Sequence, residues 1–149
     1  TLHTNDAVGA VARLGDLGVD GFKAGGALIG AVAQRLLRSI CLECKEPVEP
    51  NEKLLNALTK GRPFNSDGLF YHGKGCKKCL GTGYSGRIPI YEILTITPAI
   101  AEAIEHNKPA SKIRELAVAE GMVELTTAGL ERVAAGKTTL EEVFYKISS

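Results

Sequence analysis

The sequence predicts a mixed α/β protein with a cysteine-rich segment in its middle. Three observations support this: apolar residues recur at helical spacing near both ends, strand-like apolar runs flank the middle, and four cysteines form two Cys-x-x-Cys pairs. With 149 residues and 44% hydrophobic composition, the chain can bury a core. The formal net charge of +1 gives no general basis for binding nucleic acid or anionic lipid, and neither is expected.

The first forty residues predict two helices and a strand. Asn5 or Asp6 can cap a helix that runs to about Leu17, and a second helix is predicted over about 21–32. Residues 33–41 fit neither period cleanly, and we favour a strand that leads into the first cysteine. The longest apolar stretch is far shorter than a membrane span, so no membrane insertion is expected. The abrupt start without methionine suggests a piece of a longer protein.

The cysteines predict a structural zinc site. A two-residue gap lets two sulfurs face one ion, and two such gaps supply the four thiolates that structural zinc prefers. Two reducible disulfides or four unrelated buried thiols are the alternatives. The predicted zinc ligands are Cys41, Cys44, Cys76 and Cys79.

The segment 41–86 is the predicted zinc subdomain, with a short helix near 51–59 and a strand at 68–72. Zinc with four thiolates carries a net charge of −2, which nearby lysines can offset. A nucleic-acid-binding ribbon is the less favoured interpretation, because few aromatic residues lie between the basic ones. The nearby lysines that can offset the charge of the zinc site are Lys45, Lys74, Lys77 and Lys78. We interpret His72 as a zinc-adjacent residue.

Two glycine-containing strings resemble nucleotide-binding motifs. "GTGYSG", residues 81–86, matches G-x-G-x-x-G, but a cysteine pair precedes it and a strand-like run follows, so we interpret it as a tight turn. "GKT", residues 136–138, lacks the earlier glycine of a Walker A loop, because Glu131 stands there. Helical spacing before Gly136 instead predicts a helix C-terminus at this glycine.

The last third predicts one strand, "RIPIYEIL", and then helices. Thr97 with Pro98 predicts a helix start, and a stripe of apolar residues ends at Gly121. Thr139 with Glu142 predicts a capping box. His106 is interpreted as a surface residue. The final helix is predicted to bury Leu140, Val143, Phe144 and Ile147.

In four stretches the chain resembles the C-terminal part of the secretion ATPases that drive type II secretion and type IV pilus assembly. The stretches are "TLHTNDAVGAVARL", "GAVAQRLLRSICLECK", "GCKKCLGTGYSGRIPIYEIL" and "TTLEEV". They follow one another in the same order over nearly the whole chain. The resemblance implies the end of a RecA-like ATPase core in residues 1–40, the zinc subdomain in 41–86, and a strand with a helical C-terminal subdomain in 87–149.

The resemblance also implies a catalytic residue and partners. "TLHTN" corresponds to the family's histidine box, which places His3 near the γ-phosphate of ATP. Members are P-loop motors that use ATP and Mg²⁺, form homo-hexamers at the cytoplasmic face of the inner membrane, and act through an inner-membrane platform protein. Their Walker motifs precede the histidine box and are not in this sequence. The chain alone is therefore expected to lack activity, and we assign no cofactor-binding residues.

Two other functions remain open from the sequence. An independent structural-zinc module that binds a protein partner would need the same four cysteines and no nucleotide. A redox protein is less favoured, because neither cysteine pair begins a helix after a strand, as in thioredoxin-like proteins.

Overall fold

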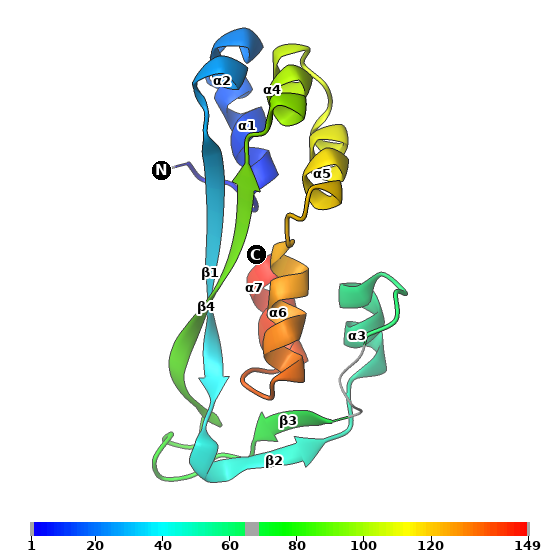
Figure 1. The fold of residues 1–149 in the computed structure, drawn as a ribbon. Coiled ribbons are helices and arrows are strands. Elements are labelled where there is room, and N and C mark those ends of the chain that lie inside the picture. The colour runs from blue at the N-terminus through cyan, green and yellow to red at the C-terminus, as the bar shows by residue number, and fades with distance from the viewer. Residues whose placement is uncertain (1, 65–68, 149) are drawn as a thin grey trace. The chain divides into compact units, whose positions relative to one another are not determined.

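A computed structural model describes residues 2–64 and 69–148 and confirms the predicted mixture of helices and strands (Figure 1). No helix in these residues is long and apolar enough to cross a membrane. The helices are α1 (Ala7–Asp16), α2 (Gly21–Ala27), α3 (Glu52–Thr59), α4 (Pro98–Glu105), α5 (Ala110–Ala119), α6 (Leu125–Ala134) and α7 (Leu140–Ser148). The strands are β1 (Gly30–Ile40), β2 (Lys45–Val48), β3 (Phe70–Gly73) and β4 (Tyr84–Thr95).

The chain divides into two compact units, each built from segments that are far apart in the sequence. Unit 1 consists of Thr1–Gln34 and Tyr91–Leu125, and unit 2 consists of Arg35–Ile90 and Thr126–Ser149. The division of the sequence into 1–40, 41–86 and 87–149 stays a prediction, as does the RecA-like origin of its first part.

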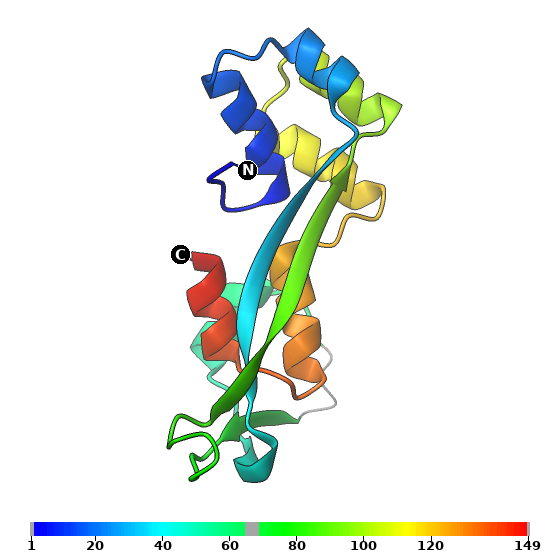
Figure 2. The same ribbon diagram turned by 90° about the vertical axis from the view of Figure 1, so that its left-hand side faces the viewer.

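The long strands β1 and β4 pair with each other and contribute to both units. They run antiparallel (Figure 2): the Ile96 N–H donates to the Ile29 carbonyl near one end, and the Cys41 N–H donates to the Gly83 carbonyl near the other. The predicted strand over 33–41 is thereby confirmed. The predicted end of the second helix, at about residue 32, is wrong. Helix α2 ends at Ala27, because the strand that pairs with β4 begins at Gly30.

Unit 1 is a small helical layer whose predicted caps are confirmed. Asp6 accepts a hydrogen bond from the Gly9 amide at the start of α1, and Thr97 accepts one from the Ile100 amide at the start of α4. Helix α2 packs against α4 through Gly21 and Gly25, one turn apart. A Cβ on Gly25 would lie 2.9 Å from the Ala101 carbonyl oxygen, so the two backbones can approach this closely only without a side chain.

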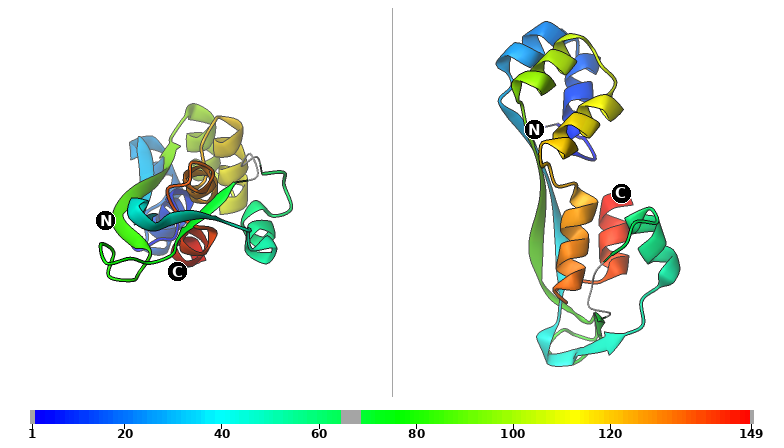
Figure 3. Two further views of the ribbon diagram at one scale, coloured as in Figure 1. Left: turned by 90° about the horizontal axis from the view of Figure 1, so that it is seen from below. Right: turned by 45° about the vertical axis from the view of Figure 1, so that its right-hand side comes forward.

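Unit 2 combines the antiparallel pair β2–β3 with helices α3, α6 and α7 (Figure 3). Helix α3 contacts α7, and α3 confirms the helix predicted near 51–59. Strand β3 confirms the strand predicted at 68–72, shifted toward Gly73, and residue 68 lies outside the described residues. Strand β2, which contains Pro47, was not predicted.

The "GKT" string is a helix junction, as predicted. Gly136 has φ +62, and its N–H donates to the Val133 carbonyl while the Lys137 N–H donates to the Arg132 carbonyl. These two bonds form a Schellman motif, in which glycine is favoured because the left-handed conformation strains other residues. The Lys137 carbonyl then accepts from the Ile40 N–H, which holds the junction against the end of β1.

The capping box predicted at the start of α7 is only half correct. Thr139 Oγ1 does accept from the Glu142 amide. The Glu142 carboxylate, however, accepts from the backbone N–H and the Nε of Arg38 on β1, at 3.0 and 2.8 Å. The predicted apolar face is also wrong in part, because Phe144 is 37% exposed and Ile147 is half-buried.

The ion pair between Arg38 and Glu142 makes the stability of unit 2 depend on pH. Glu142 is 1% exposed, and this burial opposes ionisation, but the hydrogen bonds and charge of Arg38 outweigh it and lower the pKa of Glu142. A lowered folded-state pKa stabilises the fold above the ordinary value of 4.5, and this contribution is lost as the pH falls through the folded value.

We therefore predict that Glu142→Gln lowers the free energy of unfolding by about 1–3 kcal/mol at pH 7, because it leaves donors of Arg38 without a charged acceptor. Urea unfolding followed by circular dichroism measures this at pH 7 and pH 3. The difference from wild type should shrink at pH 3. Glu141→Gln, an exposed neighbour, is the control, and an equal loss in both variants would contradict the prediction.

Candidate functional site

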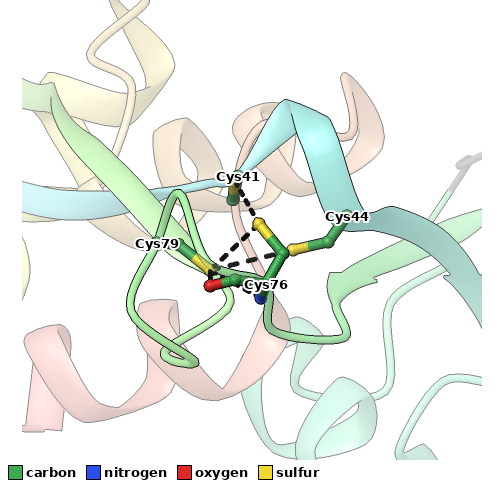
Figure 4. A group of neighbouring side chains, drawn as sticks. All are labelled: Cys41, Cys44, Cys76 and Cys79. Atoms are coloured by element: carbon green, nitrogen blue, oxygen red, sulfur yellow. Dashed lines mark hydrogen bonds between the residues drawn. The ribbon is translucent and has the colours of Figure 1, made fainter.

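The four predicted cysteines lie together in unit 2 (Figure 4). Cys41 directly follows β1, and Cys44 ends a 3₁₀ turn (Leu42–Cys44) that precedes β2. Cys76 and Cys79 lie in the connection between β3 and β4. All four Sγ atoms are within 4.8 Å of one another, so the four cysteines can hold a metal ion.

Three of the separations between the sulfurs fit tetrahedral coordination. The Sγ atoms of Cys41 and Cys76 are 3.9 Å apart, those of Cys44 and Cys79 also 3.9 Å, and those of Cys76 and Cys79 3.7 Å. Zinc–sulfur bonds of about 2.3 Å in a tetrahedron give sulfur separations of about 3.8 Å. A disulfide would require about 2.05 Å, and all four cysteines are free.

Backbone amides point at the sulfurs. The amides of Cys76 and Gly83 donate to Cys79 Sγ at 3.1 and 3.3 Å, and the Gly75 amide donates to Cys44 Sγ at 3.3 Å. The donation from Cys76 is the main reason that the pKa of the Cys79 thiol falls to about 6. Burial raises the pKa of the Cys44 thiol to about 12. Amides that stabilise a thiolate prepare the sulfur for a cation.

The glycines of "GTGYSG" form the turn that the sequence predicts. Gly81, Gly83 and Gly86 all have positive φ, and β4 begins at Tyr84 inside the string where a dinucleotide site would need a helix, so the string has no dinucleotide-binding geometry. The backbones of Gly73 and Gly83 lie in contact, leaving no room for a Cβ on either. The second cysteine pair is thus held against the end of β3 and, through the Gly83 carbonyl, against Cys41.

Three of the four lysines near the site have partners other than the sulfurs. Lys45 Nζ lies 4.1 Å from the centre of the Tyr71 ring, and Lys74 Nζ lies 3.9 Å from Glu46. Lys78 donates to Glu43 at 2.8 Å. This bond chiefly, and to a lesser extent the charges of Cys41 and Cys76, raises the pKa of Lys78. Of these three, Lys78 is therefore the one for which the structure indicates charge compensation at the sulfurs.

None of the three histidines belongs to the four-cysteine cluster. His72 on β3 pairs with Glu46 on β2, with Nε2 3.1 Å from the carboxylate. His106 is exposed at the end of α4, where its Nδ1 lies 2.8 Å from the Glu102 carbonyl, as expected for a surface residue. His3 is exposed in the irregular segment 2–6 before α1, and Thr1 lies outside the described residues.

The sequence prediction missed the burial of two glutamates: Glu142 in unit 2, which it placed only in a capping box, and Glu92 in unit 1, which it did not single out. Glu92 accepts hydrogen bonds from the Ala7 and Leu125 amides, and Arg114 lies beside it. Strand alternation could have found Glu92, because it shares the buried face of β4 with Ile90 and Leu94.

Comparison with known proteins identifies relatives of this chain. The family described as "Type II/IV secretion system protein" matches residues 1–145. The type IV pilus assembly ATPase PilB of Thermus thermophilus is 43% identical over 143 residues, which cover 96% of this chain and 16% of that protein. The type II secretion system ATPase E of Vibrio cholerae is 40% identical over 146 residues, which cover 96% of this chain and 28% of that protein.

These matches define the class as type II/IV secretion system proteins. A third relative, the type IV pilus assembly ATPase PilB of Myxococcus xanthus, is 38% identical over 147 residues, covering 96% of this chain and 25% of that protein. The chain belongs to the type II/IV secretion system protein family. It spans 16% to 28% of the length of these relatives.

Leu80, next to Cys79, provides a test of the turn geometry. It is 88% exposed with φ +52, a conformation that costs a leucine about 1–2 kcal/mol. We predict that Leu80→Gly stabilises the metal-loaded protein by about 1 kcal/mol, measured by thermal unfolding. Leu42, 83% exposed in the 3₁₀ turn, is the control: Leu42→Gly should destabilise by about 0.5–1 kcal/mol. Destabilisation by both variants would contradict the prediction.

Loss of one sulfur should abolish the metal site. We predict that Cys76→Ser removes stoichiometric metal and lowers the melting temperature, while the helices after Thr97 largely remain. Elemental analysis and circular dichroism measure the two effects. Lys77→Gln, an exposed residue between the cysteines of the same pair, is the control and should keep the metal. Unchanged metal content and stability in Cys76→Ser would show that the cluster holds no structural ion.

Proposed function

We propose that this chain is the C-terminal part of a hexameric ATPase that powers type IV pilus assembly or type II secretion. The match of the family to residues 1–145 carries the proposal, supported by relatives of both kinds at 38–43% identity. The chain would supply the last piece of a RecA-like core, and the rest of the parent protein would supply the Walker motifs. ATP and Mg²⁺ would bind to the parent.

The four cysteines are proposed to hold one structural zinc ion. Three of the sulfur separations, at 3.7–3.9 Å, fit zinc, and four thiolate ligands leave no position open for a substrate. Zinc binding contributes on the order of 10 kcal/mol to folding in small thiolate sites. In this proposal zinc orders the ends of β1 and β4, and takes no part in the reaction.

The proposed partners and location follow from the family. The parent would form a homo-hexamer at the cytoplasmic face of the inner membrane and would act on a membrane platform protein, without inserting into the membrane or binding nucleic acid. The alternative, an independent zinc-binding interaction module, is not favoured, because ATPases match 96% of this chain.

His3 is the proposed catalytic residue of this part of the parent. An exposed ring in an irregular segment can approach a phosphoryl group that the rest of the protein binds. We predict that His3→Ala in the parent hexamer lowers Mg²⁺-dependent ATP turnover by about 10²-fold, because it removes a group that meets developing charge. A coupled phosphate-release assay measures this turnover.

His106→Ala is the matched control, since His106 is also exposed in unit 1 and should leave turnover unchanged. Circular dichroism checks that both variants fold. Wild-type turnover in His3→Ala would refute the catalytic assignment. A parent that hydrolyses no ATP at all would refute the proposed function.

A further inference from the structure

A buried carboxylate joins three segments of unit 1. Glu92, on β4, is 1% exposed. Its Oε1 accepts from the Ala7 amide at 2.9 Å, and its Oε2 accepts from the Leu125 amide at 3.2 Å. Both amides belong to first residues of helices, where N–H groups have no partner within the helix. Glu92 therefore fixes where α1 begins.

Arg114, on α5, lies among three carboxylates. Its Nη2 is 2.7 Å from Asp6 Oδ2, and its Nη1 is 3.7 Å from Glu92 Oε2 and 3.6 Å from Glu124 Oε1. Glu92 would be costly as a lone buried charge, and this cation compensates it. The planar guanidinium can reach Asp6 and Glu92 at once, which the single ammonium of a lysine would reproduce poorly.

Asp6 uses both of its oxygens. Oδ1 accepts from the Gly9 amide at 2.7 Å and caps α1, while Oδ2 meets Arg114. Gly9 leaves space for this cap, because a Cβ there would lie 3.1 Å from Oδ1. The point at which the segment 2–6 enters α1 is thus fixed by the Ala7 amide and by both oxygens of Asp6.

These contacts of Asp6 and of the Ala7 amide limit the positions that His3 can occupy. Two residues, Thr4 and Asn5, separate His3 from Asp6, so the path from His3 to Asp6 is three residue steps, at most about 10 Å. Because the segment 2–6 contains no helix or strand, its course depends on where it is held. An error of about 1 Å in the position of a reacting group can cost about 10²-fold in rate.

We propose that Arg114 is a positioning residue that acts through Asp6 and Glu92 to hold His3 in place. The inference rests on the proposed function, in which His3 meets the γ-phosphate. Arg114 itself contacts carboxylates in unit 1 and need not contact nucleotide. Its loss should therefore slow the chemical step and leave the binding of ATP nearly unchanged.

A double-mutant cycle in the parent hexamer tests the proposal. Arg114→Gln should lower kcat by about 10-fold or more and change KM for ATP by less than about 3-fold. In the His3→Ala background the same substitution should have almost no further effect on kcat, because the ring that it displaces is already absent. Arg114→Lys should recover part of the loss.

Lys112→Gln is the matched control on the same helix. Lys112 pairs with Glu115 at the surface, and its loss should leave kcat unchanged in both backgrounds. If Arg114→Gln does not fold, Asp6→Asn replaces it in the cycle, because asparagine keeps the cap but weakens the ion pair.

The outcomes separate this proposal from the one on which it rests. Full turnover in His3→Ala would refute the role of His3 and, with it, the positioning of His3. A slow His3→Ala together with a fully active Arg114→Gln would overturn only the role of Arg114. Equal kcat losses from Arg114→Gln with and without His3 would likewise show that Arg114 acts on stability or elsewhere in the protein.

Discussion

The meeting of four sulfur atoms is the constraint on which the structure of unit 2 depends. Cys41 directly follows β1, Cys44 precedes β2, and the pair Cys76 and Cys79 precedes β4, so one ion would join three stretches of chain. The connections between these stretches contain only short helices and strands. They include several glycines and bury few apolar side chains. An ion that contributes on the order of 10 kcal/mol rivals the whole stability of an ordinary domain, about 5–15 kcal/mol.

Each unit also uses one buried glutamate to connect a strand with a helix. In unit 2 Glu142, in the first turn of α7, accepts from the Arg38 backbone on β1. In unit 1 Glu92, on β4, accepts from the amide that begins α1. In both cases an arginine compensates the buried charge. Such pairs add little net stability over an apolar contact, but removing one partner is costly, which makes the geometry specific.

The sequence predicted the local features and missed those that depend on distant segments. Helix starts at Asp6 and Thr97 and the junction at Gly136 were correct, because a cap or a left-handed glycine acts within a few residues. The cysteine cluster was predictable because its spacing carries the ligand geometry. The end of α2 and the partners of Glu142 were not, because β4 pairing and Arg38 decide them. Arg114 gave no signal, since its three partners, Asp6, Glu92 and Glu124, come from different positions along the chain.

X-ray absorption at the zinc edge tests most directly the claim that the four cysteines hold one zinc ion. The chain would be purified under reducing conditions without added chelator, and its zinc content measured on the same sample. The account predicts one zinc ion per chain with four sulfur neighbours at about 2.3 Å. A chain without zinc, or a zinc ion whose neighbours include nitrogen or oxygen in place of any of the four sulfurs, would contradict it.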